Sequence, residues 1–178
     1  TGAALSLGFY LPANAKEAEV IKLGTAGNLG IDLNAWISID TTGKVTIINH
    51  RSEMGQGSWQ SVPQIIAEEL EVDLNKVNIV FAQGNNAKYG SQITGGSSTV
   101  RGSYTKLLKL SATAREMLVD AAAKKWNVLN TECFAADGHV VHKTSGKKFH
   151  YGELVQEASK LEPPKSVRLK LPEEYKIL

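Results

Sequence analysis

Two short segments near residue 40 alternate apolar side chains with smaller or polar ones. They are residues 35–39 (AWISI) and 45–48 (VTII), and the turn-forming residues Asp40-Thr-Thr-Gly43 lie between them. A period of two on both sides of such a turn predicts a β-hairpin. Residues 77–81 (VNIVF) predict a further short strand. A polar loop follows, from residue 83 to residue 99.

Three segments repeat apolar residues at helical spacing. The first is residues 59–71, with Ser58 or Ser61 as possible N-caps, although Pro63 leaves the exact start open. The second, residues 100–125, predicts one long amphipathic helix of about 39 Å. The third is residues 151–159. The second and third helices are separated by a predicted hairpin, 133–136 and 139–142 around Asp137-Gly138, and by a strand near 148–149.

Strands and helices therefore alternate without a regular βαβ repeat. This order predicts an α+β fold: a mixed, mostly antiparallel sheet with helices packed on one face, including the one long helix. The loops at 53–58 and 95–99 are expected at one edge of the sheet.

The chain divides into three parts. Residues 1–15 are apolar and end in Ala13-Asn14-Ala15, the form of a signal-peptidase site, so we interpret them as the remnant of an export signal and expect a periplasmic protein. A buried N-terminal strand is the alternative. Residues 16–33 are an irregular lead-in, and residues 34–178 form the domain, which ends in a proline-broken, extended exit.

Composition excludes several classes of protein. The 178 residues include 20 Lys+Arg and 18 Asp+Glu, and a net charge of +2 gives no field to attract nucleic acid. No apolar run is long enough to span a membrane. The only cysteine, Cys133, is expected to be buried, and there is no cysteine framework for a metal or an iron–sulfur cluster.

Two glycine-bearing loops are the candidates for binding chemistry. Residues 53–58 (EMGQGS) and 95–99 (GGSST) each lie directly before a predicted helix. Glycines let a ligand approach the backbone closely, and helix N-terminal N–H groups favour anions. The alternative is that both loops are tight turns and helix caps. Neither loop has the spacing of a nucleotide-triphosphate or dinucleotide fingerprint.

The residues also carry a resemblance to a family. The segment "SIDTTGKVTIINHRSEMGQGSWQSVPQIIAEELEVDLNKVNIVFA", followed by "SQITGGSSTVRGSY" and a long helix, resembles the molybdopterin-binding large subunit of the xanthine dehydrogenase and aldehyde oxidase family. Within it, the isoquinoline 1-oxidoreductase beta-subunit group is the nearest match. The resemblance covers residue 34 to the C-terminus and rests on the two motifs in this order.

The resemblance implies a site for the molybdenum cofactor, molybdopterin. In the family the M-G-Q-G stretch contacts the pterin and its phosphate, and the second loop also lines the cofactor. The metal is held by the cofactor and not by the protein. Carried over to this sequence, the implied cofactor-binding residues are Met54, Gly55, Gln56, Gly57, Gly95, Gly96, Ser97 and Thr99.

The family's catalytic glutamate and its other glycine-rich loop have no counterpart here. The resemblance therefore implies part of a molybdenum hydroxylase, an oxidoreductase acting on aldehydes or N-heteroaromatic compounds, that is inactive alone. Its partners would be the remainder of the same large subunit, an iron–sulfur small subunit and an electron acceptor. A non-catalytic ligand-binding module or a subunit-assembly module is the alternative.

Several other polar and aromatic residues are expected to be structural. Glu68, Glu69 and Glu71 are interpreted as a solvated helix face, and Trp59 and Trp126 as core aromatics at helix ends. His139 and His142 are interpreted as ordinary hairpin histidines, and no partners are visible for His50 and His150. Arg101 is either a surface residue or a partner for a phosphate or a carboxylate.

Overall fold

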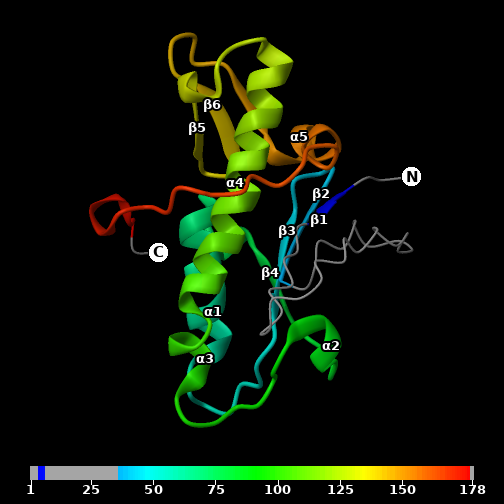
Figure 1. Cartoon of the computed structure of the whole chain (residues 1–178), viewed down its shortest axis with the longest axis vertical. Coiled ribbons are helices and arrows are strands. Elements are labelled where there is room, and N and C mark those ends of the chain that lie inside the picture. The colour runs from blue at the N-terminus through cyan, green and yellow to red at the C-terminus, as the bar shows by residue number, and fades with distance from the viewer. Residues whose placement is uncertain (1–3, 7–35, 177–178) are drawn as a thin grey trace.

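The computed structural model describes residues 4–6 and 36–176, and Figure 1 draws the others as a thin grey trace. In the first sheet the strands lie in the order β1 (Ala4–Ser6), β2 (Ile37–Asp40), β3 (Val45–Asn49) and β4 (Asn78–Phe81). Only β3 and β4 are parallel, and the chain between them forms helix α1 (Ser58–Leu70) and a 3₁₀ turn, η1 (Leu74–Lys76). The predicted hairpin is confirmed.

A second, antiparallel sheet contains β5 (Cys133–Ala136), β6 (His139–His142) and β7 (Lys148–His150). The 3₁₀ turn η2 (Asn130–Glu132) precedes it, and helix α5 (Tyr151–Ala158) follows it. The mixed, mostly antiparallel α+β class is thus confirmed, but the strands divide between two sheets. The long helix α4 (Tyr104–Trp126) carries the chain from the first sheet to the second, as Figure 1 shows.

The core joins both sheets through the helices. Burial alternates along β2 and β3, so Ile37, Ile39 and Ile47 turn inward. Helix α1 packs on α4, and α5 packs on α4 and on the first sheet. The hydroxyl of the fully buried Tyr151 donates to the carbonyl of Leu70 at 2.8 Å. Shared packing of this kind makes the two sheets one cooperative core.

The long predicted helix is in fact two helices. A short helix, α3 (Ser98–Arg101), ends at Gly102, whose N–H bonds back to the Ser98 carbonyl, and α4 begins at Tyr104. Within the polar loop there is a further single-turn helix, α2 (Asn86–Tyr89). Apolar periodicity continues through the break, which is why the sequence pattern alone joined the two helices.

The aromatic expectations were partly wrong. Trp59 is not a core residue, because it is 37% exposed and packs on Phe81 with ring centroids 4.5 Å apart. Trp126 is half-buried and stacks on Phe149.

The rings of His139 and His150 lie edge to face, with centroids 5.0 Å apart. Cys133 is buried as expected, and burial raises the pKa of its thiol.

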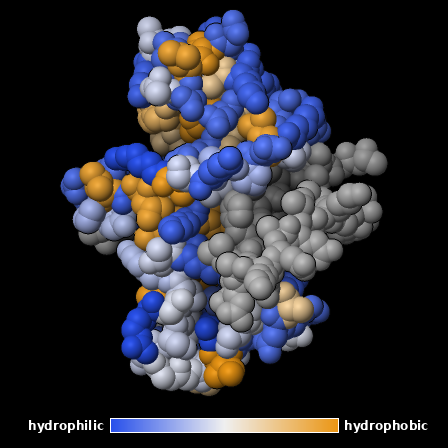
Figure 2. Space-filling model, in the orientation of Figure 1, coloured by the Kyte–Doolittle hydropathy of each residue, from blue (hydrophilic) through white to orange (hydrophobic). Residues whose placement is uncertain are grey.

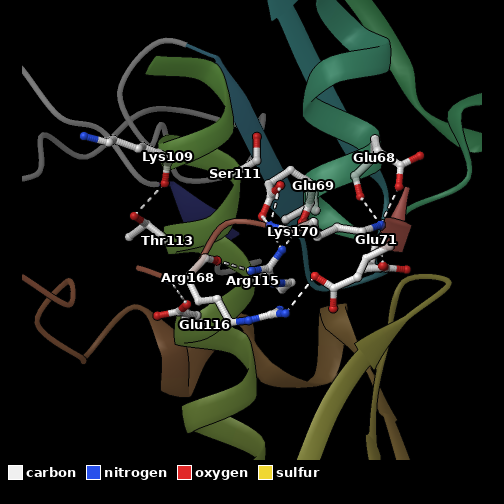
Figure 3. A network of polar contacts seen from close by, with 12 residues as sticks. Glu68, Glu69, Glu71, Lys109, Ser111, Thr113, Arg115, Glu116, Arg168 and Lys170 are labelled. Carbon is white, nitrogen blue, oxygen red and sulfur yellow. Dashed lines mark hydrogen bonds and ion pairs between the residues drawn. The ribbon is translucent and has the colours of Figure 1, made fainter. Parts of the chain in front are cut away.

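The acidic residues near the end of α1 do not form a solvated face. Glu69 is fully buried, and its carboxylate accepts hydrogen bonds from Arg115 of α4 at 2.5 Å and from the Lys170 N–H at 3.1 Å (Figure 3). Glu68 is buried too and pairs with the Lys170 ammonium, which also lies 2.7 Å from Glu71. The solvated-face interpretation was wrong, because hydropathy cannot reveal counter-charges that come from distant segments.

These pairs hold the C-terminal segment in place. Arg115 donates to the Arg168 carbonyl at 2.6 Å, and the Arg168 N–H donates to Glu116 at 2.8 Å. Beyond Lys170, the short turn η3 (Pro172–Glu174) leads to Lys176, whose N–H donates to Glu68 at 3.0 Å. The segment expected to be an open exit is therefore anchored across α1 and α4.

The pKa shifts show how far burial and pairing compete at these charges. Burial raises the pKa of Glu69, although Arg115 opposes the shift. Burial likewise disfavours the ionised forms of Glu68 and Lys170. Their mutual hydrogen bond and the neighbouring opposite charges outweigh the effect of burial, so the pKa of Glu68 is lowered and that of Lys170 is raised. Both residues consequently remain charged at neutral pH.

Replacing Arg115 by Met is expected to destabilise the protein by about 3–5 kcal/mol, because it leaves the Glu69 charge buried without its partner. Urea denaturation followed by circular dichroism measures the loss. Lys160→Met is the matched control, since it removes an exposed ion pair with Glu157 and is expected to cost less than about 1 kcal/mol. Equal losses in the two variants would contradict the role given to the buried pair.

Candidate cofactor-binding site

The first loop is held by a carboxylate from its own sequence. Glu53 accepts hydrogen bonds from the N–H groups of Gly55 (2.7 Å), Gly57 (3.0 Å) and Trp59 (2.7 Å), and from the Ser58 hydroxyl. Gly57 is the N-cap of α1 in a left-handed conformation, so neither Ser58 nor Ser61 caps the helix. The helix N–H groups expected to face a ligand are instead taken by Glu53, a negative charge favoured at a helix N-terminus.

The Gln56 amide is also bonded within the first loop. Its oxygen accepts from the Met54 N–H at 2.5 Å, and its nitrogen donates to the Ser52 carbonyl and the Ser58 hydroxyl. Glu53 and Gln56 therefore fix the loop from inside. The outer surface is left to Met54, which is 70% exposed, and to the exposed backbone of Gly55 and Gly57.

The second loop presents its backbone to solvent as well. Gly95, Gly96 and Ser97 are exposed, and Ser97 has a left-handed conformation and makes no side-chain cap bond to α3. Arg101 donates from its guanidinium to the Gly96 carbonyl at 3.0 Å and so supports the loop. Thr99 is buried inside α3 and is not its N-cap. Ser97 thus occupies the N-cap position of α3 without a side-chain cap bond, and Thr99 lies within the helix.

Both loops lie at one end of the molecule. Helices α1 and α3 pack together, and Figure 1 shows that the loops leading into them meet at the end opposite the second sheet. The loops expected at one edge of the sheet therefore share one end of the molecule. That end is largely pale in Figure 2, the colour of residues of intermediate hydropathy, with an apolar side chain beside it.

A cleft of about 500 Å³ opens beside the first loop. Its lining residues come from the ends of β3 and β4 and from the loop around α2: His50, Arg51, Ser52, Glu53, Phe81, Ala82, Gly84, Asn86 and Gln92. His50 and Arg51 were not among the predicted site residues. Their position directly before the glycine motif was the only signal in the sequence.

The charges beside the first loop are strongly perturbed. Hydrogen bonds from the Trp59 and Gly57 N–H groups lower the pKa of Glu53 to about 2, so the loop is held by an ionised carboxylate. Burial, together with the charges of Arg51 and Lys106, lowers the pKa of His50 to about 4. At neutral pH the imidazole is therefore uncharged, and Arg51 is the cation of the cleft.

Comparison with known proteins identifies the family. Residues 13–176 match the model of the molybdopterin cofactor-binding domain. The chain belongs to this family. This molybdopterin cofactor-binding domain is 34% identical to the isoquinoline 1-oxidoreductase subunit beta of Brevundimonas diminuta over 128 residues. The alignment covers 68% of this chain and 16% of that subunit.

Two further comparisons agree with the assignment. The domain is 29% identical to the membrane-bound aldehyde dehydrogenase [pyrroloquinoline-quinone] of Gluconacetobacter polyoxogenes. That alignment covers 86% of this chain and 20% of the aldehyde dehydrogenase. It superposes on quinoline 2-oxidoreductase from Pseudomonas putida 86 with a TM-score of 0.54 and 25% identity, covering 72% of this chain and 17% of that one. The chain thus spans a fifth or less of the length of these proteins.

The domain shows neither a membrane span nor a metal cluster in its described part. None of the helices described is both long and apolar enough to cross a bilayer. Within residues 4–6 and 36–176, no three His, Cys, Asp or Glu side chains gather in a way that would hold a metal ion.

Glu53→Gln is expected to loosen the first loop, because a neutral amide is a weaker acceptor for three backbone N–H groups. In the unchanged protein, the stabilisation of the loop by the ionised Glu53 carboxylate is complete above the ordinary carboxyl pKa of 4.5. It is lost as the pH falls through the lowered pKa of about 2. Amide hydrogen exchange at Gly55 and Gly57 measures the loosening, and the Glu53 carboxyl ¹³C shift measures the titration.

Glu162→Gln is the matched control for this experiment. It makes the same change at an exposed position outside the loop, and it is expected to leave exchange at Gly55 and Gly57 unaltered. Unchanged exchange in Glu53→Gln, or a Glu53 midpoint at the ordinary value, would show that the carboxylate does not hold the loop.

Proposed function

We propose that this chain supplies part of the molybdopterin-binding surface of a larger molybdenum-dependent oxidoreductase subunit. The observation that carries the proposal is the match to the cofactor-binding family together with the two glycine loops at one end of the fold. The proposed cofactor-contacting residues are those expected from the sequence: Met54, Gly55, Gln56, Gly57, Gly95, Gly96, Ser97 and Thr99. Thr99 is buried and would act by fixing the loop.

The residues present fit such a ligand. A Cβ atom built on any of the four loop glycines meets nothing within 4 Å, so the space above the backbone is open. The Thr94 hydroxyl, just before the second loop, is buried and has no partner in the described structure. Open backbone and an unused hydroxyl suit a flat, polar heterocycle.

Each loop has a binding role and no catalytic one in this proposal. When bound, the cofactor supplies the redox chemistry through its molybdenum. The chain's own residues hold the ligand: Glu53 and Gln56 keep the first loop rigid, and Arg101 supports the second through the Gly96 carbonyl. Preformed loops of this kind bind with little loss of conformational freedom.

The substrate class follows the names of the similar proteins. Isoquinoline, quinoline and aldehyde oxidoreductases among them support a complete enzyme that oxidises an N-heteroaromatic compound or an aldehyde. The remainder of the same subunit would complete the site, with an iron–sulfur small subunit and an electron acceptor. Export to the periplasm is part of the proposal and rests on the apolar residues 1–15, which end in Ala13-Asn14-Ala15. The pairing of β1 (Ala4–Ser6) with β2 instead agrees with the alternative of an N-terminal strand.

An apolar rim beside the loops supports a covering partner. Ile93 is 74% exposed, Met54 70% and Phe81 50%, and the partly exposed Trp59 packs on Phe81. Large exposed apolar side chains around a candidate site are typical of interfaces. The remainder of the subunit is the proposed partner, because the chain spans only 16% of the isoquinoline-type subunit.

Gly96→Ala is expected to reduce molybdopterin content in the complete subunit by about tenfold, because a methyl group would fill ligand space. Cofactor analysis of the purified subunit measures the loss. Gly146→Ala is the matched control: φ is +58° at Gly96 and +67° at Gly146, and both have open space at the Cβ position. The backbone strain is therefore similar, and only the place differs.

Equal cofactor content in the two glycine variants would remove the second loop from the site. Ser97→Ala gives a further comparison, because its hydroxyl makes no cap bond to α3. It is expected to lower cofactor content while the melting temperature of the apo-protein stays the same. A melting shift with cofactor content preserved would instead support the structural alternative.

The 178-residue chain by itself is expected to retain less than a tenth as much molybdenum per mole as the complete subunit, because it spans only a fifth or less of its relatives. Metal analysis of both proteins, purified in parallel, tests this. Stoichiometric molybdenum on the short chain would contradict the shared site. Activity without molybdenum in the complete subunit would favour a non-catalytic or assembly role for this domain.

A further inference from the structure

The cleft beside the first loop contains a buried cation without a counter-ion. Arg51 is 8% exposed, and no carboxylate of the described residues lies within ion-pair distance of its guanidinium. Every other buried cation in this part of the fold has a partner, as Arg115 and Lys170 show. An unpaired buried charge is expensive, so a missing anion is the simplest completion of this site.

A second unpaired donor lies beside it. The Nε of Arg51 donates to Nε2 of His50 at 3.2 Å, and since arginine always carries its protons, Nε2 must be the unprotonated acceptor. His50 is neutral at pH 7, so its proton is on Nδ1. That nitrogen is buried in a side chain only 4% exposed, and it has no partner among the described residues. An N–H without an acceptor and a free guanidinium thus occur on adjacent residues.

Glu53 lines the same cleft but does not supply the anion. Its carboxylate oxygens accept from three backbone N–H groups and the Ser58 hydroxyl, so they are directed into the loop. Gln92 is occupied too, since it bonds to the Asn85 N–H and the Gln83 carbonyl. The terminal N–H groups of Arg51 and Nδ1 of His50 remain as donors without an acceptor among the described residues, and Ser52 lies next to them in the cleft.

We propose that the cleft lined by His50, Arg51 and Ser52 is a binding site for a phosphate group. Donors from three neighbouring side chains match the several oxygens of a phosphate better than the two of a carboxylate. The cleft volume of about 500 Å³ accommodates a phosphate together with the part of a larger molecule that bears it. That this phosphate belongs to the cofactor rests on the proposed function; free phosphate has the same chemistry.

The first experiment titrates the full chain with inorganic phosphate and follows the backbone amide signals of Ser52 and Gly84 by NMR. Saturable shifts at both residues are expected in the unchanged protein. Arg51→Gln is expected to weaken binding by about tenfold or more, because it removes a charge-assisted contact. Arg51→Lys keeps the charge and is expected to retain part of the affinity. Lys147→Gln, an exposed change on the distant β6–β7 turn, controls for net charge.

A second experiment distinguishes the sources of the phosphate. Cofactor content of the complete subunit is measured for Arg51→Gln and for Lys147→Gln. Loss only in Arg51→Gln assigns the cleft to the cofactor's phosphate, whereas phosphate binding with cofactor content unchanged assigns it to a separate phosphate ligand. Either result supports the site.

Absence of saturable shifts in the unchanged protein would overturn the inference, as would equal phosphate affinity in Arg51→Gln. If Arg51→Gln fails to fold, the titration of the unchanged chain and of Arg51→Lys decides the matter. The proposed function is tested separately at Gly96. Cofactor loss there without phosphate binding here would leave the proposed function standing and remove only this site.

Discussion

The buried carboxylate of Glu69 is the interaction on which the arrangement of the helices depends. It lies where α1, α4 and the C-terminal segment meet, and it accepts from Arg115 and from the Lys170 backbone. Replacement of a buried ion pair by apolar residues is often tolerated, but removal of one partner is not. The pair therefore acts as a constraint on geometry: α1 and α4 must keep the crossing at which both charges are satisfied.

That constraint reaches the candidate site through α1. The charged residues are near the end of this helix, and the glycine motif with Glu53 is at its beginning, so a helix fixed at one end presents the loop at the other. The loop is then made rigid by its own side chains, Glu53 and Gln56, and Asn49 of β3 donates to the Ser58 carbonyl at its end. Stability and binding are thus assigned to opposite ends of one helix.

The motifs predicted where a site would lie, but not which hydrogen bonds its side chains make. Read from the sequence, Gln56 and the helix N–H groups pointed to a ligand. In the structure the Gln56 amide bonds to Ser52, Met54 and Ser58, and the N–H groups at the start of the helix bond to Glu53. Ser97 is at the N-cap position of α3 but its side chain makes no cap bond, and Thr99 lies within that helix. His50 and Arg51 gave no signal beyond adjacency to the motif, because a cation's missing partner becomes visible only when its surroundings are complete.

The sequence by itself determined most of the local structure: both hairpins, the first and last helices, and the two loops before helices. Those features depend on periods of two or 3.6 residues and on turn residues, which are short-range properties. Tertiary structure alone decided the division into two sheets, the break at Gly102 and the burial of Glu68 and Glu69. Glu69 of α1 accepts from the N–H of Lys170, which lies 101 residues further along the chain. No local sequence pattern indicates a partner at that distance.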